Sequence, residues 1–283
     1  MRLFLLTSLT MIAFAANSVL NRMALAGGHI EAVQFGTIRL VAGAVMLAAL
    51  CLLMRGALRF TGTGQAIGVA ALVTYIYGFS LAYEALDAGL GALILFGMVQ
   101  ITMFASAVLG REIIPLRRWI GAGLALAGLA WLMWPGAGAH VSLLHGALMA
   151  LAGIAWGVYS LVGRGAVDAL GATAANFVLA VPVGLFAFLV LPAAPDAARA
   201  TMPGVGLATL SGAVTSGLGY ALWYLVLPRL QASVAAVAQL TVPVIALTGG
   251  VVFLDETVSL RIALASALVL GGVALSVLWK RGA

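Results

Sequence analysis

Apolar residues occur in stretches of about 20 along the chain, and short polar or Gly- and Pro-containing segments separate them. A helix of about 20 residues spans the hydrocarbon core of a bilayer, which is about 30 Å thick. Division at charges and at Gly/Pro clusters predicts an all-α polytopic membrane protein with ten transmembrane helices. These cover approximately 3–24, 32–53, 65–85, 90–109, 118–134, 145–164, 172–192, 205–227, 232–254 and 259–279.

Composition agrees with a membrane location and excludes several other classes. The chain is 64% hydrophobic and 8% charged, with a mean hydropathy of +1.18, far from soluble usage. The fourteen basic residues are scattered, so we expect no nucleic-acid partner. The single cysteine, Cys51, excludes an internal disulfide. Because His29, His140 and His145 fall in predicted loops, we expect no metal site and no cofactor.

Two segments half a chain apart resemble each other. At an offset of 142, residues 13–22 (AFAANSVLNR) align with residues 155–164 (AWGVYSLVGR), which pairs Phe14 with Trp156 and Arg22 with Arg164. At an offset of 144, Leu124, Leu126, Gly128 and Ala130 recur as Leu268, Leu270, Gly272 and Ala274. We therefore interpret residues 1–141 and 142–283 as two five-helix repeats that form one structural unit.

Five is an odd number of crossings, so the second repeat begins on the opposite side of the membrane. The two halves are then inverted relative to each other, as in many secondary transporters, whose substrate site lies where the halves meet. The start MRLFLL looks like a signal peptide, but the matching internal segment cannot be one. We therefore expect residues 3–24 to be the first transmembrane helix.

The distribution of basic residues predicts the orientation, because loops rich in Lys and Arg stay in the cytoplasm. With the N-terminus inside, ten basic residues lie inside and Arg22, Arg199 and Arg261 lie outside. We therefore expect a multi-pass protein of the cell inner membrane with both termini cytoplasmic.

A glutamate follows the fourth and the ninth predicted helix, in LGREIIPLRRWIG (109–121) and FLDETVSLRIALA (253–265). With ten short helices and a five-plus-five duplication, these motifs resemble the drug/metabolite transporter superfamily, in particular its EamA-type exporters. Within that group the chain is similar to the YddG-type inner-membrane exporters of aromatic amino acids. The resemblance implies efflux of small metabolites through a cavity walled by helices 1, 3, 4, 6, 8 and 9, with helices 5 and 10 at the periphery.

Polar and aromatic side chains in the middle of predicted helices are the candidate substrate-binding residues, because polar groups that face lipid are costly. Amides could bind the amino-acid backbone groups, and rings could stack on an aromatic substrate at about 0.5–1.5 kcal/mol for each pair. Interhelical hydrogen bonding and plain packing are the alternatives. The candidates are Asn17, Tyr77, Gln100, Trp156, Tyr159, Tyr220, Trp223 and Gln239.

Several further residues have predicted roles. Pro243 removes a backbone hydrogen bond within the ninth helix, so it is either a gating hinge or a static kink. Gly121, Gly123 and Gly128 of the fifth predicted helix and Gly271 and Gly272 of the tenth are expected at close helix contacts, with dimer contacts as the alternative. Arg39 is the one charge deep in a helix, and we expect it to snorkel or to pair with Glu31 or Glu84, with attraction of a substrate carboxylate as the alternative. Tyr83 is expected in the interfacial aromatic belt.

No Asp or Glu lies deep in a predicted helix, which disfavours proton antiport. The hypothesis is an exporter of hydrophobic and aromatic amino acids, such as Phe, Trp and Tyr, that works by alternating access and facilitated diffusion. A proton-coupled exporter of lipophilic cationic drugs or other metabolites is the nearest alternative. A membrane enzyme is disfavoured because no loop is long enough to hold clustered catalytic groups, and a channel stays open as a possibility.

Overall fold

The computed structural model describes residues 1–58, 60, 64–111, 113–134, 142–164, 166–190, 200–230 and 232–278. The regular structure of these residues is helical, and it forms ten consecutive segments at the predicted positions. The first seven are α1 (Arg2–Ala26), α2 (Ala32–Arg55), α3 (Gln65–Ala82), α4 (Ala88–Leu109), α5 (Leu116–Met133), α6 (Leu143–Arg164) and α7 (Ala169–Val190). The eighth joins α8 (Met202–Leu210), η1 (Ser211–Leu218), α9 (Gly219–Val226) and η2 (Leu227–Arg229), and α10 (Ala232–Leu254) and α11 (Leu260–Leu278) complete the chain.

Length and hydropathy agree with membrane crossing for most of these segments. Seven are long and apolar enough to span a bilayer, namely α1–α4, α6, α7 and the composite eighth segment. In α10 and α11 the described apolar stretches are shorter, Ala238–Leu254 and Leu260–Leu275. Large apolar side chains such as Leu53, Leu189 and Phe253 are exposed on the outside of the bundle, as expected of a surface that faces lipid.

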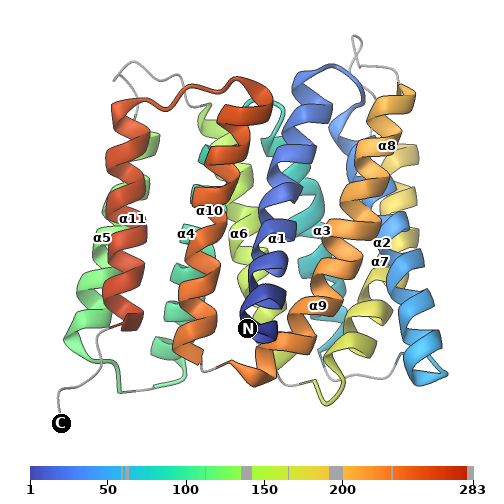
Figure 1. Cartoon of the computed structure of the whole chain (residues 1–283), viewed down its shortest axis with the longest axis horizontal. Coiled ribbons are helices and arrows are strands. Elements are labelled where there is room, and N and C mark those ends of the chain that lie inside the picture. Colours follow the sequence, from blue (N-terminus) through green and yellow to red (C-terminus); the bar gives the residue numbers. More distant parts are fainter. Residues whose placement is uncertain are drawn as a thin grey trace.

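Figure 1 shows the ten segments standing side by side with alternating directions. α5 packs along α11 at one edge of the bundle, and α2 packs along α7 and α8 at the other. The helices α1, α3, α4, α6 and α10 lie between these edges. α1 begins and α11 ends at the same end of the bundle, the lower end in Figure 1; the opposite end is called the upper end below.

The eighth segment differs from the regular helix that its hydrophobicity predicts. Its middle part, η1, is a π-helix of eight residues. A π-helix has i→i+5 hydrogen bonds and is usually confined to a single turn, often at a functional site. Its first and sixth residues, Ser211 and Ser216, therefore share one side of the helix, and both are buried in the middle of the bundle.

Candidate functional site

A small cavity lies in the middle of the bundle. Five segments line it, α1 with Phe14, Asn17 and Ser18, α3 with Tyr75 and Phe79, α4 with Leu95 and Phe96, α6 with Trp156, and α9 with Tyr220. The cavity has room for roughly one water molecule, because the centre of a water-sized sphere can occupy only about 10 Å³ of it. A solute as large as an amino acid therefore enters only if these side chains move.

Aromatic rings fill the space around this cavity. Trp156 is their hub, with ring centroids 4.9 Å from Tyr75, 5.0 Å from Tyr220 and 5.4 Å from the stacked ring of Tyr159. Phe14 meets Trp156, Tyr220 and Trp223 edge-on. These geometries are the favourable ones for aromatic pairs. The connected set, called the aromatic cluster below, is Phe14, Tyr75, Phe79, Tyr83, Trp156, Tyr159, Phe177, Tyr220 and Trp223.

Helical spacing builds this cluster from each segment. On α3, Tyr75, Phe79 and Tyr83 recur every four residues, so their rings follow one face of the helix and its end. On α6, Trp156 and Tyr159 are three residues apart and share a face.

Asn17 connects α1 with the π-helix. Its Oδ1 accepts hydrogen bonds from the hydroxyls of Ser211 at 2.8 Å, of Thr215, and of Ser216 at 3.5 Å. All four side chains are buried. Asn17 therefore forms the interhelical hydrogen bonds that were the alternative to substrate contact, and it also lines the cavity.

Arg39 lies about two turns into α2 and is completely buried, with 0% of its surface exposed. Its Nε donates to Ser216 at 3.0 Å and its Nη2 to Tyr75 at 2.9 Å. The guanidinium carbon lies 4.9 Å from the centroid of Phe79, within cation–π distance. The expected snorkelling and pairing with Glu31 or Glu84 are wrong, because these contacts hold the side chain inside the bundle.

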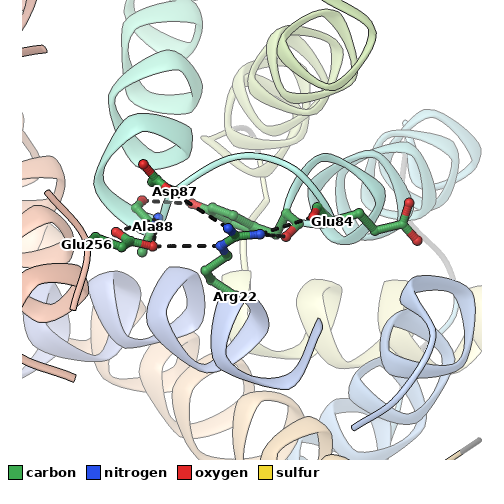
Figure 2. A network of polar contacts seen from close by, with 6 residues as sticks. Arg22, Glu84, Asp87, Ala88 and Glu256 are labelled. Atoms are coloured by element: carbon green, nitrogen blue, oxygen red, sulfur yellow. Dashed lines mark hydrogen bonds and ion pairs between the residues drawn. The ribbon is translucent and has the colours of Figure 1, made fainter. Parts of the chain in front are cut away.

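A second polar site lies at the upper end and ties α1, the α3–α4 turn and the α10–α11 loop together (Figure 2). Arg22 donates to the carbonyls of Tyr83 and Glu84, both at 3.1 Å. Its guanidinium lies 3.6 Å from Asp87 and 3.8 Å from Glu256. We call Arg22, Tyr83, Glu84, Asp87, Ala88 and Glu256 the upper network.

Glu256 has two functions in this network. Its two carboxylate oxygens accept from the backbone N–H of Ala88 at 2.8 and 3.0 Å, so it caps α4, whose N-terminus carries a partial positive charge. It also faces Arg22. Burial raises the pKa of the Glu256 carboxyl, and Asp87 nearby adds to the rise, whereas the Ala88 N–H and Arg22 oppose it.

Tyr83 is not an interfacial belt residue. It is completely buried, its ring packs edge-on at 4.7 Å against Phe79, and its hydroxyl donates to the Ala88 carbonyl at 3.2 Å. The prediction was wrong because the end of α3 is covered by the α3–α4 turn and by α4. Tyr83 thereby joins the aromatic cluster to the upper network.

The predicted site residues fall into two groups. Asn17, Trp156 and Tyr220 line the cavity, and Tyr159 and Trp223 contact rings that line it. Tyr77 instead lies between α2 and α7, where its hydroxyl is 2.8 Å from that of Thr37. The half-buried Gln100 on α4 and Gln239 on α10, and the buried Pro243 inside α10, are not among the lining residues of this cavity.

Sequence reasoning missed Ser216, Phe79 and the position of Arg39. Hydrophobic Phe79 gave no signal by itself, and Ser216 depends on the π-helix. The i, i+4 repetition of rings on α3 could have revealed Phe79. Glu112 and His140, both considered in the sequence, lie outside the residues that the structure describes.

A bundle of apolar helices around a buried polar and aromatic centre defines a polytopic membrane protein with a central site. Residues 144–278 match the EamA-like transporter family. "Uncharacterized protein PA1977" of Pseudomonas aeruginosa is 46% identical over 275 residues, which cover 97% of this chain and 94% of that protein. The second half of the chain therefore carries an EamA-like transporter domain, and the protein is a membrane transporter of small molecules.

Two further proteins are similar to this chain. An "Uncharacterized transporter" of Archaeoglobus fulgidus is 24% identical over 213 residues, 74% of each chain. A solved structure titled "Crystal structure of protein" superposes with a TM-score of 0.64 at 20% identity, covering 98% of this chain and 99% of its own. That likeness shows the fold alone.

Proposed function

We propose that this transporter exports small hydrophobic amino acids, especially aromatic ones such as Phe, Trp and Tyr, across the cell inner membrane. The aromatic cluster around the central cavity is the observation that carries this proposal. Its rings come from α1, α3, α6, α7 and α9, so they converge from both halves of the chain. A substrate ring that enters between them replaces ring–ring contacts with similar ones. This favours an aromatic substrate over a polar one, and the YddG-type resemblance points the same way.

The transport mechanism in this proposal is alternating access between two inverted halves, residues 1–141 and 142–283. Reciprocal contacts between α5 and α11 support the inversion. A Cβ on Gly128 would meet Ala265, Leu268 and Val269, and one on Gly272 would meet Gly121, Leu124 and Ala125. Each position in the second set precedes its counterpart in the first by 144, the offset of the sequence repeat. Exchange of the halves by a twofold axis produces such reciprocity.

Two further pairs agree with the same axis. Phe14 and Trp156, equivalent at an offset of 142, contact each other in the middle of the bundle. Arg111 and Asp255, equivalent at an offset of 144, both have a φ of +54°, which non-glycine residues rarely adopt. Local backbone geometry is therefore alike at the ends of α4 and α10.

The upper end is the outer side in this proposal, as the basic residues of the loops favour. The upper network then closes the exit, and opening separates Arg22 from Asp87 and Glu256 while the lower end closes. The six acidic side chains of the described residues, Glu31, Glu84, Asp87, Asp168, Asp255 and Glu256, all lie outside the helices. This placement supports facilitated diffusion rather than proton antiport.

Efflux of radiolabelled phenylalanine from proteoliposomes tests the proposal. We expect saturable flux, counterflow, and competition by tryptophan and tyrosine. Trp156→Ala should abolish this flux, whereas Trp119→Ala, on α5 against Phe104, is the matched control that should retain it. Absence of saturable flux for a panel of amino acids would remove the substrate class. Flux of tetraphenylphosphonium instead would favour cationic cargo, and accumulation driven by an imposed pH gradient would replace facilitated diffusion with proton coupling.

A further inference from the structure

The guanidinium of Arg39 is a buried positive charge that the described residues do not neutralise. It has five N–H donors. Nε and Nη2 donate to Ser216 and Tyr75, but Nη1 is buried and has no hydrogen-bond partner. Neutral hydroxyls accept hydrogen bonds without supplying a negative charge. The acidic groups of the described residues lie outside the helices, and none forms an ion pair with Arg39.

This arrangement is costly in a membrane protein. Burying an ion in a medium of low dielectric carries a penalty of several kcal/mol, and the attraction of an opposite charge is the usual compensation. Hydrogen bonding between helices would not by itself require a charged side chain, because serine and tyrosine hydroxyls can form hydrogen bonds with each other. A structural role therefore accounts for Nε and Nη2 and leaves both the charge and Nη1 unexplained.

A second unpaired group lies beside the first. The hydroxyl of Tyr220 is buried and makes no hydrogen bond of good geometry, but it lies near enough to interact with the Arg39 guanidinium and the Tyr75 hydroxyl. The Tyr220 ring lines the central cavity, as do the rings of Tyr75 and Phe79, which lie against the guanidinium. The hydroxyl of Tyr220 thus belongs to a lining residue, and the Arg39 guanidinium lies directly behind the lining rings of Tyr75 and Phe79.

Gly212 explains how the charge comes so close to this wall. A Cβ at Gly212 would collide with the Arg39 carbonyl oxygen, so glycine lets α2 and η1 touch at this level. The contact brings Ser216 within reach of Nε. Both helices therefore present Arg39 toward the middle of the bundle.

We propose that Nη1 of Arg39 and the hydroxyl of Tyr220 bind the carboxylate of the transported molecule. The inference rests on the proposed function and adds to it that the negative group of the substrate is recognised rather than its ammonium group. The substrate class is small carboxylates with an apolar or aromatic body, of which aromatic amino acids are one kind. The ring then lies among the aromatic cluster, and the carboxylate neutralises Arg39.

A site built on Arg39 recognises the carboxylate of an amino acid and not its ammonium group, and this difference can be measured. A site that binds an ammonium group usually offers a carboxylate or several acceptors, and among the described residues that line the cavity none is acidic. Removing the ammonium from phenylalanine should therefore preserve binding, whereas removing the carboxylate should destroy it.

Calorimetric titration of the purified protein with three probes measures their affinities and tests the proposal. The probes are phenylalanine, 3-phenylpropionate, which lacks the ammonium, and phenethylamine, which lacks the carboxylate. We expect both carboxylates to bind, and phenethylamine to bind about 10- to 100-fold more weakly, as for loss of a hydrogen bond to a charged group. Binding of phenethylamine as tight as that of 3-phenylpropionate would overturn the proposal.

Two variants assign the effect to Arg39. Arg39→Met should weaken 3-phenylpropionate about 10- to 100-fold and leave phenethylamine unchanged. Asn17→Asp, which keeps the shape of Asn17, places a carboxylate where Ser216 donates, so this internal anion should also weaken carboxylate binding. Unchanged carboxylate affinity in both folded variants would contradict the proposal. Arg55→Met, at an exposed ion pair with Asp168 at the lower end, is the matched control and should bind normally.

The two proposals fail in different ways. Saturable phenylalanine flux that persists in Arg39→Met would keep the export function and remove the anion site. Arg39-dependent binding of 3-phenylpropionate without phenylalanine flux would keep the anion site and remove amino-acid export.

Discussion

Arg22 and Arg39 belong to one bundle but have opposite surroundings. Arg22, 19% exposed, faces two carboxylates and two backbone carbonyls at the upper end. Arg39 is completely buried and has two hydroxyls and two aromatic rings. The charge of Arg22 is compensated by Asp87 and Glu256, whereas no acidic side chain of the described residues pairs with Arg39. An arginine with protein partners holds segments together, whereas an arginine without an anion is suited to receive one from a ligand.

The two regions also differ in what stabilises them. Charges and a helix cap hold the upper network, and both respond to pH and solvent. Ring packing holds the centre, where the polar contacts join Asn17 and Arg39 to a few hydroxyls. We therefore expect substitutions in the centre to act through packing and ligand binding, and those at the upper end to act through opening.

The largest expected effect comes from the hub of the aromatic cluster. Trp156→Ala removes contacts with Phe14, Tyr75, Tyr159 and Tyr220, so we expect a loss of about 3–5 kcal/mol in the free energy of unfolding. Denaturant titration in detergent measures it. Trp119→Ala, where the ring is half exposed, is the control and should cost less than about 1 kcal/mol. Equal costs would mean that packing at the centre is not special.

The two arginines should respond to the same substitution with opposite signs. Arg39→Met removes an uncompensated buried charge, so without ligand we expect stability to rise by about 1–2 kcal/mol, or to stay level where the lost hydrogen bonds offset the gain. Arg22→Met leaves Asp87 and Glu256 facing each other without a cation, so stability should fall by about 1–3 kcal/mol. Thermal unfolding of both proteins measures the difference. Strong destabilisation by Arg39→Met would break the contrast.

A smaller effect concerns access to the cavity from the upper end. In a Cys51→Ser background, Ser18→Cys places a thiol in the cavity wall beneath the upper network. A membrane-impermeant maleimide, applied from the outside, labels this thiol when the upper end opens. Arg22→Ala should raise the labelling rate about tenfold, which corresponds to a decrease of about 1.4 kcal/mol in the free energy that favours the closed form. Arg55→Ala, at the lower end, should leave that rate unchanged. An unchanged rate in Arg22→Ala would mean that the network does not close this end.

The smallest effect is the pH dependence of closure. Burial raises the pKa of Glu256 in the closed arrangement, with Asp87 adding to the rise and the Ala88 N–H and Arg22 opposing it. The closed form therefore binds a proton more tightly than a form with Glu256 in water. Closure is favoured as the pH falls through the raised pKa and weakens as the pH rises above it. Labelling of Ser18→Cys should slow on mild acidification, and Glu256→Gln should remove that dependence.

Much of the fold follows from hydrophobicity. The ten segments, their order and their ends came from apolar stretches of membrane length, because lipid obliges each crossing to be a helix. Trp156, Tyr220 and Asn17 were found for a similar reason, since aromatic and amide side chains at mid-helix need a buried neighbour.

The remaining features depend on contacts between distant segments. Whether an arginine two turns into a helix snorkels or turns inward is decided by Gly212 and Ser216, some 175 residues further along the chain. Tyr83 was misplaced because the cover over α3 comes from the α3–α4 turn and α4. The placement of Tyr77 toward Thr37 likewise reflects the packing of α2 on α3. Periodicity within a single helix can reveal a shared face, as for the rings of α3, but it does not tell which distant segment covers that face.

The π-helix between α8 and α9 allows a change in helical winding to rotate one part of the eighth segment relative to the other. Rewinding Ser211–Leu218 from i→i+5 to i→i+4 bonding would turn α9 about its long axis relative to α8. Tyr220 and Trp223 would rotate with α9, while α8 kept its contacts with α2. A change of winding in eight residues can thereby be converted into rotation of the rings that line the centre.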